Sequence, residues 1–174
     1  EHFDYGHWYD RGKLQLRNIL NCQYIASMNP TAGSFVINPR MQRHFFTLAI
    51  GFPGPTSLHT IYSTFLEGHL APFTEEVQGA AQALLGGALT LHTAITGTFR
   101  KSAQNFHYEF NIRHLANVFQ GLLQAQPDQF KTQDKFAMLW LHESERVYGD
   151  RLVSLEDLGK YRAQAAAQAK KRFP

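Results

Sequence analysis

Cysteine is almost absent from this chain, because Cys22 is the single one in 174 residues. One thiol cannot form an internal disulfide, so the composition fits a reducing compartment such as the cytosol better than a secreted location. The chain also lacks the run of roughly 20 apolar residues that a transmembrane helix needs. Its first ten residues, EHFDYGHWYD, lack the basic-then-apolar layout of a signal peptide. We therefore expect a soluble protein without a membrane partner.

The chain has little excess of either charge, and few groupings typical of catalysis. Its net charge of +3, from 17 basic and 14 acidic residues, is too small to indicate a nucleic-acid partner. Its nine histidines are scattered, and none has metal-ligand spacing with cysteine. His142-Glu143 is followed by Arg146 where a metalloprotease helix needs a second histidine. No metal site and no covalent nucleophile are therefore predicted.

Two short apolar runs near the N-terminus indicate a sheet. Residues 22–28 end at an Asn-Pro pair, and residues 45–52 are closed by Pro-Gly-Pro. Both patterns predict strands buried on both faces. Pro39, between them, suits the first turn of a short helix. Strand, helix and strand in this order predict a parallel pair joined by a right-handed crossover.

After Pro55 the apolar period becomes helical, and no further strand is expected. Gly86-Gly87 should weaken the middle of the longest helix, and Ser154 is a fair start for the last one. The residues that set the helical periods are Leu58, Ile61, Tyr62, Phe65 and Leu66; Val77, Ala81, Leu84, Leu85, Ala88, Leu91, Ile95 and Phe99; Leu115, Val118, Phe119 and Leu122; and Phe136, Leu139, Trp140 and Val147. The predicted class is α/β in residues 1–54 followed by all-α in 55–174. Two strands cannot cover both faces of a sheet, so a piece of a longer chain is expected.

Polar residues at three places in the chain are candidates for a phosphate site. Asn29 would lie at the carboxyl end of a strand, where open α/β sheets bind ligands, although Asn-Pro also commonly opens a turn. Arg40 and Arg43 share one face of a short helix and suit phosphate contact, or are surface arginines. Arg113 falls at the expected start of a helix, a position that favours anions, or forms an ordinary salt bridge there.

The parts that would complete a nucleotide site are missing from the sequence. The chain has no GxxxxGK loop, which is the Walker A motif. It also has no apolar strand that ends in paired acids to hold magnesium, as the Walker B motif does. We therefore expect the segment to be inactive alone.

Four sequence blocks carry a specific resemblance. They are GHWYDR at 6–11, MNPTAGSFVINPRMQRHF at 28–45, FHYEFNIRHLANVFQG at 106–121 and LWLHESERVYGDRL at 139–152. In order and spacing they resemble one AAA+ module of an axonemal dynein heavy chain, most like the third module of outer-arm chains of the β type. The resemblance covers nearly the whole chain. It implies the C-terminal half of a AAA+ large subdomain followed by the helical small subdomain, or lid.

The resemblance also implies roles for the candidate residues. Asn29 is similar to the first sensor residue, which monitors the γ-phosphate. Arg43 resembles an arginine finger that acts on the nucleotide of the preceding module, with Arg40 as the alternative. Arg113 resembles the second sensor, which reaches the module's own nucleotide. The family usually has an acid where this chain has His114, and a largely neutral histidine would pair only weakly with a basic group.

The implied function is a nucleotide-sensing, regulatory part of an ATP-hydrolysing microtubule motor in cilia and flagella. ATP or ADP with Mg²⁺ would bind the complete module, and no cofactor is expected for the segment alone. The implied partners are adjacent AAA+ modules, and, through the parent chain, microtubules and dynein intermediate and light chains. The implied location is the cytoplasm, the cytoskeleton and the axoneme. The alternatives are a non-catalytic interaction module of a AAA+ ring, or a module of another AAA+ ATPase.

Overall fold

The computed structural model describes residues 2–28 and 36–173. These residues form two compact units, Glu1–Gly51 and Phe52–Pro174, and each unit is described by itself. Asn29, the predicted first sensor, lies outside the described residues. The candidate arginines of the predicted finger belong to the first unit, and Arg113 belongs to the second.

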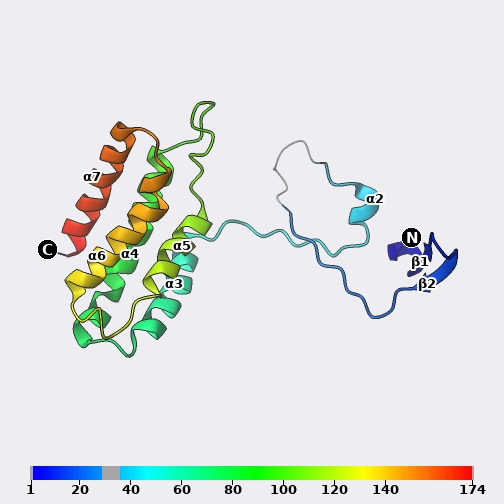
Figure 1. Cartoon of the computed structure of the whole chain (residues 1–174), viewed down its shortest axis with the longest axis horizontal. Helices are drawn as coiled ribbons and strands as arrows, with labels where there is room; N and C mark the ends of the chain where they lie inside the picture. Colours follow the sequence, from blue (N-terminus) through cyan, green and yellow to red (C-terminus); the bar gives the residue numbers. More distant parts are fainter. Residues whose placement is uncertain (1, 29–35, 174) are drawn as a thin grey trace. The chain divides into compact units, whose positions relative to one another are not determined.

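The first unit contains short elements (Figure 1). Helix α1 spans His2–Tyr5, and strands β1 (His7–Asp10) and β2 (Gln15–Asn18) form an antiparallel pair. Helix α2 spans Pro39–Gln42, and its N-cap residue Asn38 accepts a hydrogen bond from the Arg40 N–H at 2.9 Å. The predicted short helix beginning at Pro39 is thus confirmed. Proline suits this position because the N–H that it lacks would be unpaired in a first turn.

The predicted parallel pair is wrong in its detail. Residues 22–28 and 45–52 form no strand, and Ile25 and Ile50 are about nine-tenths exposed. A strand that is apolar on both faces gains burial only between neighbouring layers, and within the described residues no neighbouring strand pairs with these runs. The sheet that forms here is antiparallel and uses other residues. The wider prediction, a first piece that contains a sheet followed by an all-helical piece, is confirmed.

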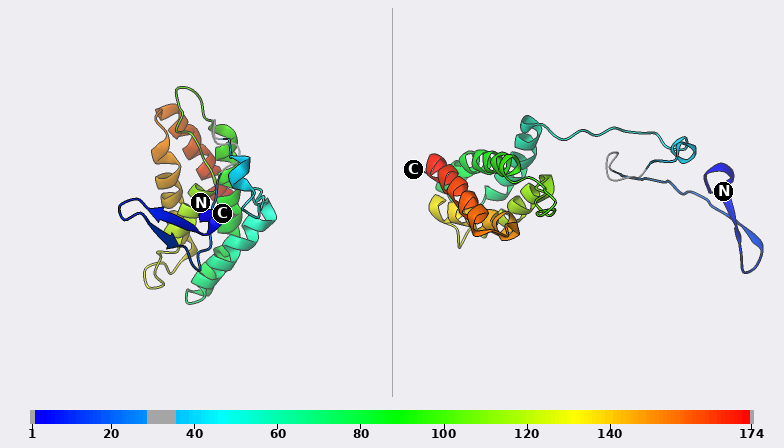
Figure 2. Two further views of the ribbon diagram at one scale, coloured as in Figure 1. Left: turned by 90° about the vertical axis from the view of Figure 1, so that its right-hand side faces the viewer. Right: turned by 90° about the horizontal axis from the view of Figure 1, so that it is seen from above.

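The second unit is helical, and its helices agree with the predicted periods. Helix α3 spans Pro55–Leu70, α4 spans Glu75–Thr98, α5 spans Ile112–Leu122, α6 spans Gln133–Val147 and α7 spans Leu155–Arg172. A short 3₁₀ turn, η1 (Gly149–Arg151), joins α6 to α7. Helix α4 packs against α3, α6 and α7, while α5 packs against α6 (Figures 1 and 2). None of these described helices has the length and apolar content to cross a membrane.

The core of the helical unit is built from the apolar stripes of these helices. Trp140 and Phe136 of α6 are fully buried, together with leucines of α3, α4 and α5. Helix α4 is continuous through Gly86 and Gly87. The missing side chain at Gly87 lets α6 pack closely against α4 at this point. A Cβ atom on Gly87 would lie 3.2 Å from the Trp140 ring. The expected weak point of α4 is therefore a contact surface for α6.

Candidate functional site

Arg113 lies in the first turn of α5, as the sequence predicted. The helix begins at Asn111, whose side-chain oxygen accepts a hydrogen bond from the Arg113 N–H at 3.0 Å. The Arg113 side chain is exposed, and within the described ranges its guanidinium has no hydrogen bond or ion pair. A permanent positive charge thus stands beside backbone donors that already favour an anion.

His114 completes the cap of α5 at the position where capping boxes usually have glutamate or glutamine. Its Nδ1 accepts a hydrogen bond from the Asn111 N–H at 3.0 Å. Its Nε2 lies 2.7 Å from Nη1 of Arg151. A neutral imidazole has one acceptor nitrogen, so it satisfies one of these two donors at a time. Burial, and then the nearby Arg151 charge, lower the pKa of His114, so the ring is neutral at physiological pH.

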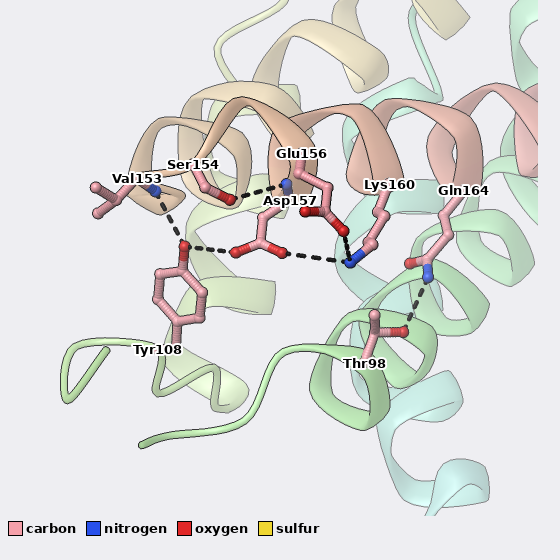
Figure 3. A network of polar contacts seen from close by, with 8 residues as sticks. All are labelled: Thr98, Tyr108, Val153, Ser154, Glu156, Asp157, Lys160 and Gln164. Carbon is pink, nitrogen blue, oxygen red and sulfur yellow. Dashed lines mark hydrogen bonds and ion pairs between the residues drawn. The ribbon is translucent and has the colours of Figure 1, made fainter. Parts of the chain in front are cut away.

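The segment between α4 and α5, residues 99–111, is fastened to the start of α7 by one tyrosine. The Tyr108 hydroxyl accepts a hydrogen bond from the Val153 N–H at 3.0 Å and donates one to the Asp157 carboxylate at 3.0 Å. Figure 3 shows Tyr108 pointing toward the first turn of α7, where Ser154 caps the helix by accepting from the Asp157 N–H. This buried ring therefore ties the chain just before α5 to the first turn of α7.

Arg151 fastens the same segment a second time. Its Nη2 donates to the His107 carbonyl oxygen at 3.0 Å, while Nη1 contacts His114. Its guanidinium carbon lies 5.8 Å from the centroid of the Phe110 ring. The 3₁₀ turn after α6 thus holds residues on both sides of the N-cap of α5.

The first unit gives Arg43 a partner that sequence reasoning did not find. The Arg43 guanidinium forms an ion pair with the Asp4 carboxylate, and its Nε donates to the Arg40 carbonyl at 3.2 Å. His44 Nε2 lies 3.3 Å from the same carboxylate. The Arg43 side chain remains 55% exposed. Arg40, the alternative finger, is exposed, and its side chain makes no ion pair within the described part of the unit.

Asp4 and Arg43, which form that ion pair, are 39 positions apart in the sequence. His114 and Arg151 are 37 positions apart. No local spacing pattern in the sequence indicates either contact. The first could have been suspected only from the acid in HFDY, and the second only from the basic residue in YGDRL. Across the described ranges, no group of three or more His, Cys, Asp or Glu side chains gathers as metal ligands would.

Two protein-family models match parts of the chain. Residues 84–174 match the AAA+ lid domain family, and residues 1–53 match the P-loop containing dynein motor region. The chain therefore belongs to the AAA+ lid domain family. Within that class the predicted resemblance to axonemal dynein heavy chains is confirmed, since proteins of that kind match nearly every residue of the chain.

Three relatives illustrate the match. The chain is 60% identical to the "Dynein alpha chain, flagellar outer arm" of Chlamydomonas reinhardtii over 173 residues. It is 49% identical to the human "Dynein axonemal heavy chain 17" and 46% identical to the "Dynein beta chain, ciliary" of Tripneustes gratilla, each over 175 residues. Each alignment covers 99% of this chain and 4% of the relative. The chain thus spans about one twenty-fifth of the length of these relatives.

Proposed function

We propose that this chain is a nucleotide-sensing, regulatory part of a dynein motor ring, most like the third AAA+ module. Residues 1–54 would be the C-terminal part of the module's large subdomain, and residues 55–174 its lid. The parent chain would hydrolyse ATP, with Mg²⁺ in the complete module, and would move microtubules in the axoneme of cilia or flagella. Its partners would be the adjacent modules, microtubules, and dynein intermediate and light chains. The segment alone would be inactive.

The presentation of Arg113 carries this proposal. An exposed guanidinium at the start of α5 adds a full charge to the partial charge of the helix N-terminus. A planar guanidinium matches phosphate oxygens with two parallel hydrogen bonds. The Asn111 cap holds the Arg113 backbone, so the residue stays at a fixed place while its side chain is available. This is the arrangement that a sensor of the module's own nucleotide requires.

The lid is cross-tied in a way that supports movement as a rigid body. The Gln133 N–H at the start of α6 donates to the Glu76 carboxylate of α4 at 3.0 Å. At the other end of α4, Thr98 accepts from the Gln164 side chain of α7 at 2.9 Å (Figure 3). Rigid rotation of such a body would pass the state of the phosphate on to neighbouring modules.

Arg43 is the proposed finger for the nucleotide of the preceding module, with Arg40 as the alternative. The ion pair with Asp4 is half exposed, and exposed pairs contribute about 0–1 kcal/mol, so exchanging the carboxylate for a phosphate costs little. The carboxylate would hold the guanidinium when no phosphate is present. Arg40, without an ion pair in the described part of this unit, needs no such exchange.

The test uses the full-length heavy chain that contains this module. Arg113→Ala and Arg43→Ala should each change the ATPase rate and the velocity of microtubule gliding, by about tenfold if a phosphate contact is lost. Arg162→Ala is the matched control, because among the described residues the side chain of this α7 arginine bonds Glu145 alone, at the surface. It should leave both quantities unchanged.

A non-catalytic interaction module is the second candidate function. The Arg43–Asp4 ion pair favours it, because that pair gives Arg43 a structural partner without any nucleotide. If this candidate is correct, Arg43→Ala and Arg113→Ala will behave like the Arg162→Ala control in both assays. That result would remove the sensor and finger assignments together.

A further inference from the structure

Arg151 joins the two sides of the N-cap of α5 from a different part of the fold. One guanidinium nitrogen donates to the His107 carbonyl at 3.0 Å, and another contacts His114 at 2.7 Å. His107 precedes the helix, and His114 lies in its first turn. The guanidinium is partly buried against the Phe110 ring. This one side chain therefore fixes how the incoming segment turns into the helix.

The contact is continuous with the backbone of Arg113. The neutral His114 ring, with its one acceptor nitrogen, accepts from either the Asn111 N–H or Arg151, and the Asn111 side chain in turn accepts from the Arg113 N–H. A displacement of His114 would loosen the cap, and capping interactions contribute about 1 kcal/mol to keeping a first turn formed. The direction in which the Arg113 side chain leaves the helix depends on that turn.

We propose that Arg151 is a positioning residue for the nucleotide sensor Arg113, acting through His107 and His114 and not through contact with the nucleotide. The proposal rests on the function proposed above for Arg113. It assigns Arg151 no contact with Arg113 itself. Its role is to keep the first turn of α5 in the arrangement that presents the sensor to a phosphate.

The two contacts, with the His107 carbonyl and with the His114 ring, explain why arginine suits this position. A planar fork of donors reaches the carbonyl and the imidazole at once, whereas an ammonium is a point charge on a flexible stem. Arg151→Lys should therefore keep the charge but lose one of the two contacts. Arg151→Ala loses both.

The experiment measures binding of a fluorescent ATP analogue to the full-length heavy chain. The relevant quantity is the component of binding that Arg113→Ala weakens, by about tenfold or more. Arg151→Ala should weaken the same component about threefold to tenfold, and Arg151→Lys about threefold. In the Arg113→Ala background, Arg151→Ala should add less than about twofold, because the residue acts through the sensor. Arg162→Ala should leave the component unchanged.

The outcomes separate the two proposals. If Arg113→Ala weakens no component of binding, the sensor assignment itself fails. If Arg113→Ala weakens binding but Arg151→Ala and Arg151→Lys match the unaltered chain, only the positioning role is overturned. The positioning role is also overturned if Arg151→Ala weakens binding equally with and without Arg113. A merely structural residue would act independently of the sensor. Should Arg151→Ala prevent folding, Arg151→Lys in both backgrounds decides the question.

Discussion

Replacing Gly121 with alanine should destabilise the helical unit, although alanine is the better helix former. Gly121 lies in the last turn of α5, beside α6. A Cβ atom there would lie 2.6 Å from Cγ of Glu143 and closer still to its carboxylate, so the glutamate must move. By helix propensity alone the substitution would stabilise the protein by roughly 0.5–1 kcal/mol. Steric contact opposes that gain.

The size of the effect follows from how firmly Glu143 is held. Its side chain is 12% exposed, and its carboxylate accepts from the Arg146 guanidinium at 2.9 and 2.6 Å. Forcing an added methyl group into such a contact costs about 1–3 kcal/mol. After the propensity gain is subtracted, a net loss of up to about 2.5 kcal/mol remains, which lowers the melting temperature by up to about 10 °C.

The assay is thermal unfolding of the chain, followed by far-ultraviolet circular dichroism. Gly79→Ala is the matched control, because an added Cβ in this exposed turn of α4 meets nothing within 4 Å. The control should raise the free energy of unfolding by about 0.5–1 kcal/mol, and with it the melting temperature. If Gly121→Ala raises it by the same amount, the close contact between α5 and α6 does not exist as described.

Two further predictions concern the histidines. His114→Glu should stabilise the lid by about 1 kcal/mol, because a carboxylate accepts from both the Asn111 N–H and Arg151; an unchanged urea midpoint would contradict this. The pKa values of His92 and His114 are lowered by burial, so the folded protein resists protonation that the unfolded chain accepts below about pH 6.5. This contribution to stability is therefore complete above that pH and is lost as the pH falls further. Urea unfolding at about pH 7.5 and 5.5 should show a smaller loss of stability in His92→Gln than in the unaltered chain.

The helices could be predicted because their burial repeats along the chain. Leu84, Leu91 and Ile95 are fully buried in α4, as their spacing indicates. The antiparallel pair of β1 and β2 could not, because both strands are four residues long and largely exposed, without an alternating pattern. The apolar runs at 22–28 and 45–52 gave a wrong prediction of strands for the opposite reason. Their pattern describes burial within a sheet that these residues do not form here.

The candidate site could likewise be predicted only in part from the sequence. The placement of Arg113 at the start of a helix was predicted, since capping residues and apolar period are local signals. The side chains that fasten its helix were not, because Arg151 and Tyr108 make contacts 37 to 49 residues away. Long-range contacts of polar side chains leave no periodic trace in a sequence. The role of Asn29 stays a prediction, as it lies outside the described residues.

Arg113 is the proposed sensor of the nucleotide in its own module. A structure of the full-length heavy chain with a bound ATP analogue tests this proposal most directly. We expect the Arg113 guanidinium to lie within about 3 Å of a phosphate oxygen of that nucleotide, in hydrogen-bond contact. A nucleotide bound in this module with Arg113 more than about 8 Å from every phosphate, where no direct hydrogen bond is possible, would contradict it.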